Sequence, residues 1–230
     1  MAPSRTLRWV LATLTRLHGA PPRPVSTDPL RLILYQQVAY LVPERQRRAA
    51  FKRLREEVGL TSKAILGASA SVLRSITRAG GPIAAPRRAE RLRQSAEIVE
   101  RRWGGNLRRA LGLPLPEARR ALAAFPMIGP PGADRILAAT GAYPVLGLDS
   151  NGVRVCLRLG WGKERPGYAA TYRTVLEGLA PELPAEPRDL AAASALLRRH
   201  GETVCRRSTP DCAGCPLAGR CPYPVRRRGG

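Results

Sequence analysis

The last part of the chain carries the feature that most constrains its fold: four of its five cysteines lie between residues 205 and 221. Cys205, Cys212, Cys215 and Cys221 follow the spacing C-x6-C-x2-C-x5-C. Thiolates at such short separations can enclose one cubane [4Fe–4S] cluster. Structural zinc also takes four cysteines, but commonly as two close pairs, and only Cys212 and Cys215 form such a pair here. The pattern favours a cluster, with zinc as the second interpretation and two disulfides as the third.

The charge of the chain is strongly unbalanced, with 39 lysine and arginine residues against 17 aspartate and glutamate residues and a formal net charge of +22. A field of this sign attracts polyanions, with nucleic acid as the first partner to consider and an anionic membrane as the second. A GC-rich genome would explain the preference for arginine over lysine, but not the excess of base over acid.

No run of about 18 consecutive apolar residues predicts a membrane span. Residues 1–20 contain scattered arginines and no clean apolar stretch, so they do not resemble a signal peptide. We therefore expect no membrane partner, and a cytoplasmic, nucleoid-associated protein of a bacterium or archaeon. Thiols stay reduced in that compartment, which favours a metal group over disulfides.

Apolar residues recur at helical spacing along most of the chain, and no stretch alternates convincingly as a strand. Glycine, proline, serine and threonine signals bound the periodic segments. One helix, from Asp28-Pro29 through Val42, is apolar on most sides, which is typical of a central helix. Cys156 lies on the apolar face of another helix and is predicted to be a buried core thiol. The fold class is all-α, with helices expected at residues 4–18, 28–42, 44–58, 61–68, 70–78, 86–103, 116–124, 131–140, 150–159, 165–178 and 187–200.

Four segments, in this order along the chain, resemble the endonuclease III group of helix-hairpin-helix DNA glycosylases. Asp28-Pro29 followed by Gln36-Gln37 looks like that family's early helix, which carries an intercalating glutamine. Phe125-Pro126-Met127-Ile128-Gly129 looks like its hairpin, and Leu148-Asp149-Ser150-Asn151-Gly152-Val153-Arg154-Val155 looks like its catalytic-aspartate segment. His200-Gly201-Glu202-Thr203-Val204-Cys205 looks like its entry into the cluster loop. The resemblance covers residues 26–223, and the combination of cysteine spacing, hairpin and aspartate is specific.

The resemblance implies two helical lobes around a DNA-binding cleft. Residues 27–144 would form a lobe like a six-helix barrel that ends in the helix-hairpin-helix, and residues 1–26 with 145–230 would form the iron–sulfur cluster lobe. It also implies a [4Fe–4S] cluster on the four cysteines and, as partner, double-stranded DNA that contains a damaged or mismatched base. We expect the protein to act as a monomer.

Asp149 is the residue that the resemblance makes catalytic. Cleavage of an N-glycosidic bond builds positive charge on the sugar, and a fixed carboxylate stabilises that charge or activates water against it. The alternative role is a helix N-cap, because Asp149 precedes a predicted helix. Ser150 and Asn151 could cap that helix as well, so capping alone does not require an aspartate.

A further set of residues is expected to contact the substrate or the DNA. Backbone N–H groups of the hairpin would bind a phosphate at a helix N-terminus without reading sequence. Adjacent glutamines in an apolar helix need partners, and an extruded base or the gap that it leaves would supply them. Each has a structural alternative: an ordinary turn, surface polar residues or, for the flanking tyrosines, core packing. The set is Tyr35, Gln36, Gln37, Tyr40, Met127, Ile128, Gly129 and Asn151, and Arg226-Arg227-Arg228 would either touch the DNA backbone or form a solvated tail.

Three positions depart from the family pattern. Bifunctional members carry a lysine eighteen residues before the aspartate, which attacks the sugar and forms a Schiff base, and here that position is Pro131. Adenine-mismatch members place a glutamate four residues before their glutamine pair and a further domain after the cluster; here that position is Leu32, and no such domain is expected. Met127 stands where the hairpin usually has glycine, so the turn geometry is open to change.

We therefore expect a monofunctional DNA N-glycosylase of base excision repair with weak or no AP lyase activity. Without an acid near the start of the pocket, a good leaving group is needed, which favours alkylated purines such as 3-methyladenine. Deaminated bases, uracil or thymine opposite guanine, are the alternative substrates. A non-catalytic iron–sulfur protein that binds damaged or structured DNA is the alternative of a different class, and an RNA-binding iron–sulfur protein has only the charge in its favour.

Borohydride trapping tests the consequence of the missing lysine. Incubated with damaged DNA and borohydride, the protein should form no efficient covalent adduct, because neither Pro131 nor its neighbour Gly132 can form a Schiff base. A lysine-containing endonuclease III treated in parallel is the positive control. Efficient trapping of this chain would contradict the expectation of simple base excision.

Overall fold

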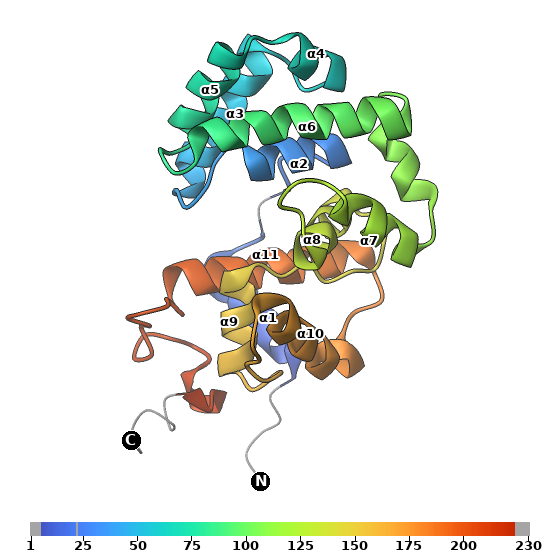
Figure 1. Ribbon diagram of the computed structural model, residues 1–230. Coiled ribbons are helices and arrows are strands. Elements are labelled where there is room, and N and C mark those ends of the chain that lie inside the picture. The colour runs from blue at the N-terminus through green and yellow to red at the C-terminus, as the bar shows by residue number, and fades with distance from the viewer. Residues whose placement is uncertain (1–5, 22, 224–230) are drawn as a thin grey trace. The chain divides into compact units, whose positions relative to one another are not determined.

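The computed structural model describes residues 6–21 and 23–223, and every regular element in these ranges is a helix (Figure 1). The all-α fold class predicted from the sequence is confirmed. Within the same ranges, no helix combines the length and the apolar character that crossing a membrane requires. The arginine tail at residues 226–228 lies outside the described residues.

The helices follow one another along the chain with short connections. Several begin at side-chain caps: Thr6, Asp28, Thr61 and Ser69 each accept a hydrogen bond from the backbone N–H of the third helical residue. In order, the elements are α1 (Leu7–His18), α2 (Pro29–Gln37), α3 (Glu44–Glu57), α4 (Ser62–Gly67), α5 (Ala70–Ala79), α6 (Ala85–Trp103), η1 (Leu107–Gly112), α7 (Leu115–Ala123), α8 (Pro130–Thr140), α9 (Ser150–Arg158), α10 (Tyr168–Leu179), η2 (Ala180–Glu182), α11 (Pro187–Thr203) and η3 (Ala218–Arg220), where η marks a 3-10 helix.

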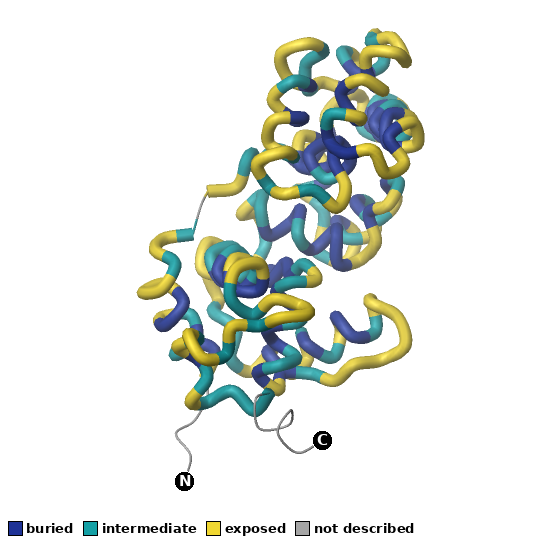
Figure 2. The backbone as a smooth tube through the Cα atoms, turned by 90° about the vertical axis from the view of Figure 1, so that its left-hand side faces the viewer, coloured by how far each residue is buried: buried dark blue, intermediate teal, exposed yellow. Residues whose placement is uncertain are grey.

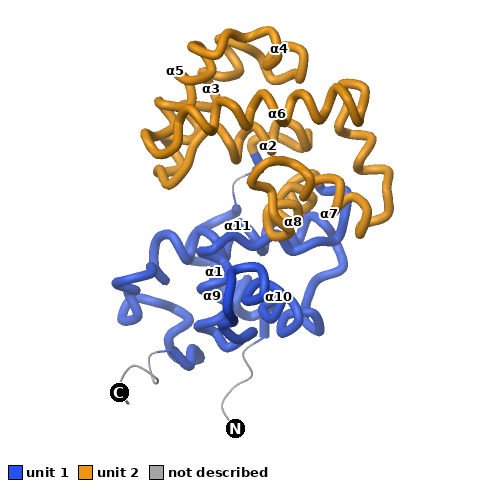
Figure 3. Tube along the Cα trace, viewed as in Figure 1, with its two compact units in different colours: residues 1–24, 141–230 blue, residues 25–140 orange. Residues whose placement is uncertain are grey.

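The chain divides into two compact units (Figure 3). Unit 1 comprises residues 1–24 and 141–230, and unit 2 comprises residues 25–140. From the sequence, we expect the boundaries of the two lobes directly after residues 26 and 144. In unit 2, α6 packs against α2, α4 and α5, and α7 packs against α8. In unit 1, α11 packs against α1 and α9.

Buried positions alternate with exposed ones along most helices, as expected for amphipathic helices that cover a core (Figure 2). In unit 1, Leu7, Val10 and Leu14 of α1 join one apolar cluster with residues of α9, α10 and α11. Cys156 lies fully buried in this cluster, and burial raises the pKa of its thiol. The prediction of a buried core thiol is confirmed.

The predicted helix through Val42 is too long, because α2 ends at Gln37. Arg47 of α3 donates from Nη1 to the carbonyls of Tyr35, Gln36 and Ala39, so these groups do not need the N–H donors of a further helical turn. In the loop that follows, Leu41 has a left-handed φ of 51° and is 73% exposed. Apolar residues continue across this loop at helical spacing, and the periodicity alone could not reveal the competing donor.

The guanidinium of Arg88, in α6, joins the loop after α2 to the loop between α5 and α6. Arg88 is 2% exposed, and burial lowers its pKa. Every one of its nitrogens donates to a backbone carbonyl, so the buried charge has a complete set of acceptors. The acceptors are Val38 (2.9 Å), Gly80 (3.0 Å), Ile83 (3.1 Å), Thr77 (2.7 Å) and Gly81.

The substitution Arg88→Met should lower the free energy of unfolding by at least about 3 kcal/mol, because it leaves several buried carbonyls without donors. Chemical denaturation measures the loss. The matched control is Arg87→Met at the exposed neighbouring position, which should change stability by no more than about 0.5 kcal/mol. Equal stabilities of the two variants would contradict the crosslinking role of Arg88.

Candidate functional site

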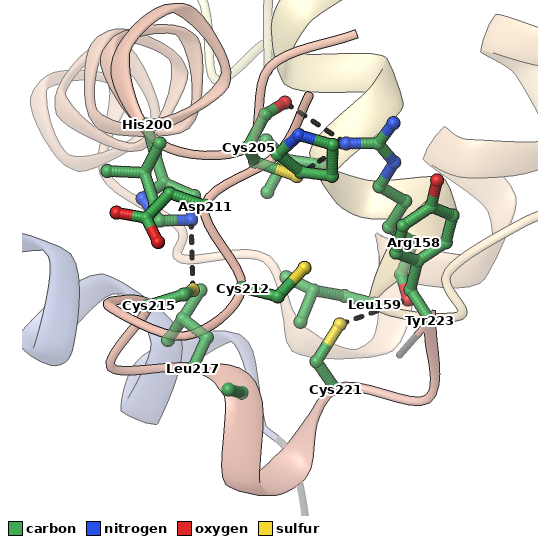
Figure 4. Close-up of a pocket in the computed structure, with 14 residues that line it drawn as sticks. Arg158, Leu159, His200, Cys205, Asp211, Cys212, Cys215, Leu217, Cys221 and Tyr223 are labelled. Atoms are coloured by element: carbon green, nitrogen blue, oxygen red, sulfur yellow. Dashed lines mark hydrogen bonds between the residues drawn. The ribbon is translucent and has the colours of Figure 1, made fainter. Parts of the chain in front are cut away.

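The cysteine loop of unit 1 folds around one pocket beside the ends of α9 and α11 (Figure 4). Cys205, Cys212, Cys215 and Cys221 all line this pocket, and none of the four is in a disulfide. Two leucines, Leu159 just after α9 and Leu217 in the loop, form apolar parts of the pocket wall. The fold thus brings to one place four thiols that the sequence spreads over the loop.

The donor set of this pocket is the one that an iron–sulfur cluster takes, with one cysteine on each iron. Structural zinc also takes four cysteines. The four cysteines line one partly apolar pocket, so the residues present fit a four-cysteine metal group.

Arg158, the last residue of α9, fixes the backbone that carries the first cysteine. Its Nη1 donates to the carbonyls of Cys205 at 3.3 Å and Arg206 at 2.8 Å, and lies 3.3 Å from Cys205 Sγ. Its Nη2 donates to the carbonyl of Arg207 at 2.9 Å. The guanidinium carbon lies 4.3 Å from the centre of the Tyr223 ring, so the arginine is clamped on two sides.

The two histidines of the chain meet beside the same pocket. His18 Nε2, at the end of α1, lies 3.3 Å from His200 Nδ1, and His200 Nε2 in turn lies 3.6 Å from Cys215 Sγ (Figure 4). His200 is 1% exposed, and burial, together with the neighbouring His18, lowers its pKa to about 4. The ring is therefore neutral near pH 7 and has one N–H to donate.

Asp149 is the N-cap of α9, and both of its carboxylate oxygens have partners. Oδ1 accepts hydrogen bonds from the N–H groups of Asn151 at 3.0 Å and Gly152 at 2.9 Å. Oδ2 lies 3.4 Å from Nε of Arg198 and 3.4 Å from Nδ2 of Asn151. The capping role expected as the alternative is confirmed, and it occupies one oxygen. The other oxygen faces Arg198, which also bonds Glu202 at 2.8 Å.

Helices α9 and α11 approach one another closely at Gly201. A Cβ atom there would lie 2.6 Å from the carbonyl oxygen of Asn151 and 2.8 Å from its Cβ, so the contact excludes any side chain. Arg154 spans the same contact, since it donates to Asn151 Oδ1 at 2.8 Å and to the Gly201 carbonyl at 2.7 Å. Asn151 is thus half-buried and held between Asp149 and Arg154, where it orients the carboxylate.

The hairpin between α7 and α8 contains a strained residue at the position that glycine usually occupies. Met127 has a φ of 63° and is 69% exposed. A residue with a Cβ atom in this left-handed region costs about 1–3 kcal/mol. The turn therefore keeps a backbone conformation that suits glycine, although the residue is methionine.

Few backbone donors are available at the start of α8. The N–H of Ile128 donates to the Phe125 carbonyl at 3.0 Å and its side chain is 3% exposed. The expected DNA contact through Ile128 stays a prediction. Pro130 and Pro131 open α8 and have no N–H. Gly129 is exposed just before α8, whereas Gly132 is buried within it.

The two glutamines of α2 have different environments. Gln37 is 4% exposed, and its Nε2 donates to Ser95 Oγ at 2.9 Å and to the Pro126 carbonyl at 3.0 Å. The amide of Gln37 is satisfied inside unit 2, where it holds the hairpin, and the expected DNA contact through Gln37 stays a prediction. Gln36 is half-buried, and its Oε1 accepts from Nη2 of Arg135 at 2.8 Å. Among the described side chains, Arg135 Nε is the one buried polar atom with no hydrogen-bond partner.

The two tyrosines also differ. Tyr35 is 8% exposed, its hydroxyl donates to Glu44 Oε1, and its ring meets that of Phe51 edge-on at 5.1 Å. Burial and the Glu44 carboxylate raise the pKa of Tyr35. Tyr35 thus packs in the core, and the expected base contact stays a prediction. Tyr40 is 49% exposed in the loop after α2, beside the more exposed Leu41.

Several residues around these candidates have no sequence signature. Arg198 meets Asp149 across 49 positions, and His18 meets His200 across 182 positions. Arg135 reaches Gln36 from another helix. Arginines occur throughout this basic chain, so spacing could not distinguish Arg198 and Arg135 from solvated ones. The one available signal was that the chain has only two histidines.

Comparisons with known proteins agree on one group. No protein-family model matches the chain. Endonuclease III of Thermotoga maritima is 26% identical over 204 residues, which cover 88% of this chain and 86% of that protein. Among solved structures, a trapped covalent endonuclease III–DNA intermediate superposes with a TM-score of 0.77 at 18% identity, covering 98% of this chain and 100% of that one. A non-covalent endonuclease III–DNA complex gives 0.76 at 18% identity (97% and 97%), and a thermostable thymine-DNA glycosylase gives 0.73 at 16% identity (96% and 97%).

The strain at Met127 predicts a stabilising substitution. Met127→Gly should raise the free energy of unfolding by about 1 kcal/mol, because glycine adopts positive φ without strain. Chemical denaturation measures the change. Met127→Ala is the matched control: it removes the exposed side chain but keeps Cβ, so it should bring no such gain. A glycine variant no more stable than the alanine variant would contradict the strain.

Proposed function

Because the chain has the endonuclease III-like fold over nearly its whole length, we propose that it is a DNA glycosylase of base excision repair. The relative in Thermotoga maritima supports this assignment, as does the basic composition. The protein would act as a monomer on double-stranded DNA with a damaged or mismatched base, in the cytoplasm and on the nucleoid. The observation that carries the proposal is the carboxylate of Asp149, which the N–H groups at the start of α9 fix in place.

Asp149 would be the catalytic carboxylate. As the base departs, positive charge develops on the sugar, and a carboxylate already held in place stabilises this charge without reorganisation. The N–H groups of Asn151 and Gly152 hold Oδ1, which leaves Oδ2 to face the sugar or to activate a water molecule. Arg198 bonds both Oδ2 and Glu202, so it can move toward Glu202 when Oδ2 engages the substrate.

Cys205, Cys212, Cys215 and Cys221 would hold a [4Fe–4S] cluster, which when bound crosslinks four points of the loop. The residues of the chain itself would do the rest. Arg158 holds the loop backbone at Arg206 and Arg207. The side chains of these two arginines are exposed and can contact DNA phosphates, whose counterions they would displace.

The hairpin would bind the DNA backbone with few N–H donors, because Pro130 and Pro131 have none. Gly129, exposed just before α8, would offer its N–H to a phosphate. Arg135 lies one helical turn after Pro131 and is half-buried, and its Nη2 donates to Gln36 Oε1 at 2.8 Å. Gln36, which Arg135 already orients, is the glutamine that remains available beside it.

The loop after α2 would fill the gap left by an extruded base. Tyr40 and Leu41 are exposed apolar side chains on a loop that Arg88 anchors through the carbonyl of Val38. Ile83, on the second loop that Arg88 holds, is also 49% exposed. Rigid exposed apolar side chains can replace a base in the stack, which lowers the cost of base flipping.

Base release would proceed by hydrolysis. The position of the family's lysine is Pro131, which is buried in α8 and has neither a nucleophile nor an N–H. The reaction would have no covalent step, and Leu32 stands where adenine-mismatch members carry a glutamate. The leaving base must therefore depart readily. Alkylated purines carry a positive charge already and meet that condition, so we propose them as the substrate. Deaminated bases are the second candidate, in keeping with the fold shared with a thymine-DNA glycosylase.

A panel of duplex oligonucleotides, each with a single lesion, distinguishes these substrates. Base release followed by alkaline cleavage should occur from duplexes that contain 3-methyladenine and related alkylated purines. Undamaged duplex is the control. Activity on uracil or thymine opposite guanine alone would reject the alkylated purines. Absence of release from every lesion, with binding retained, would favour a non-catalytic DNA-binding protein.

Asp149→Asn separates catalysis from helix capping. Asparagine caps a helix about as well as aspartate, so the free energy of unfolding should change by less than about 1 kcal/mol. The rate of base release should fall by about 10²–10⁴-fold, because the charge is lost. Single-turnover assays on the best lesion measure the rate. Asp189→Asn, at an exposed aspartate of α11, is the matched control and should keep full activity. An Asp149→Asn variant with full activity would assign Asp149 to capping alone.

A further inference from the structure

The cluster pocket has a histidine pair on one side that the proposed chemistry does not use. The chain contains two histidines, 182 positions apart, and the fold places their rings 5.5 Å apart in an edge-to-face arrangement. The inner ring reaches Cys215. In so basic a chain, where arginine supplies nearly all the cations, the convergence of both histidines on one cysteine needs a physical reason.

We propose that His18 fixes His200 in the tautomer that donates its Nε2–H to the sulfur of Cys215, so that the pair tunes the cluster held by the loop. His18 and His200 are positioning residues in this scheme, since they act through Cys215. The inference rests on the proposed [4Fe–4S] site, but not on the glycosylase activity or on Asp149.

The sulfur of Cys215 determines which tautomer of His200 is favourable. A cysteine that ligates iron is a thiolate and can only accept hydrogen bonds. His200 Nε2 lies 3.6 Å from Cys215 Sγ, so a lone pair on this nitrogen would face a negative sulfur. The arrangement is favourable only when Nε2 carries the proton. His200 is 1% exposed, so water cannot take the place of either partner.

The proton on His200 Nε2 also determines the tautomer of His18. With its proton on Nε2, a neutral His200 has an acceptor at Nδ1, and the atom 3.3 Å from it is His18 Nε2. His18 must therefore carry its own proton on Nε2. The alternative, with His200 donating from Nδ1 to His18, would leave the thiolate opposite an unprotonated nitrogen. Both tautomers thus follow from one charge on one sulfur, and the direction of donation runs from His18 to His200 to Cys215.

The pair also connects distant parts of unit 1. His18 ends α1, whose Leu7, Val10 and Leu14 pack in the core, and His200 lies on α11, which α1 contacts. The first helix of the chain therefore reaches the cluster loop through a polar contact in addition to its apolar packing. Hydrogen bonds to ligand sulfurs stabilise the more reduced, more negative cluster and so raise its reduction potential.

Nitrogen-15 NMR of the holoprotein tests the tautomers directly, because two histidines give four ring nitrogens. Protein labelled at histidine and loaded with iron and sulfide should give signals for two rings protonated at Nε2. A wild-type spectrum with His200 protonated at Nδ1 overturns the proposal. This measurement uses no variant, so it decides the question even where a substitution disturbs folding.

Reduction potentials of matched variants test the consequence. His18→Phe removes the donor to His200 and should shift the cluster potential to a more negative value. His18→Gln keeps an N–H donor at this position, so its cluster potential should lie close to that of the wild type. Arg16→Gln, at an exposed position of the same helix, should leave the potential unchanged. Equal potentials of wild type and His18→Phe, at equal iron content, overturn the tuning role.

The outcomes separate this inference from the proposed function. Purified protein that holds zinc in place of iron and sulfide overturns the cluster and the histidine proposal together. A loaded protein that releases no base, yet has both rings protonated at Nε2, rejects the glycosylase and supports the histidine pair.

Discussion

The close approach of α9 and α11 at Gly201 is the constraint on which the candidate site of unit 1 depends. Because no side chain fits between Gly201 and the backbone of Asn151, the start of α9 lies directly against α11. That contact brings Arg198 to Asp149 and lets Arg154 bond both helices. The same α11 continues through His200 into the cysteine loop, so the proposed catalytic carboxylate and the proposed cluster ligands share one rigid support.

In unit 2, arginine side chains donate to backbone carbonyls in place of helical N–H groups. Arg47 and Arg88 take the carbonyls at the end of α2, and the chain leaves the helix there because these acceptors are already satisfied. The loops that result are held from beneath by a buried charge and carry apolar side chains at their tips. Strain at Leu41 and Met127 persists because the surrounding bonds fix the backbone on both sides. The exposed parts of this unit are thus rigid by construction, which suits contact with a rigid polymer.

The sequence predicted some candidate residues well and others poorly, for reasons that individual residues make clear. The cysteines and Asp149 lie in motifs whose spacing has a chemical cause, and the fold gathers the thiols and holds the carboxylate. Gln36 and Gln37 are neighbours with the same chemistry, but successive residues of a helix point about 100° apart. One therefore reaches Ser95 and the hairpin while the other reaches Arg135. Tyr35 is buried and Tyr40 is exposed for a different reason, which is that α2 ends between them.

By itself, the sequence determined that the chain is helical, that it carries a four-cysteine loop and a hairpin, and that a proline stands at the lysine position, since each is a property of local spacing or residue type. Only the tertiary structure decided where α2 ends, which glutamine is buried, that the Ile128 N–H is bonded within the turn, and that His18 meets His200 beside Cys215. These outcomes depend on donors and acceptors supplied from elsewhere in the fold. A buried polar group must find a partner, and the partner's identity is set by which helices pack together and not by the neighbouring sequence.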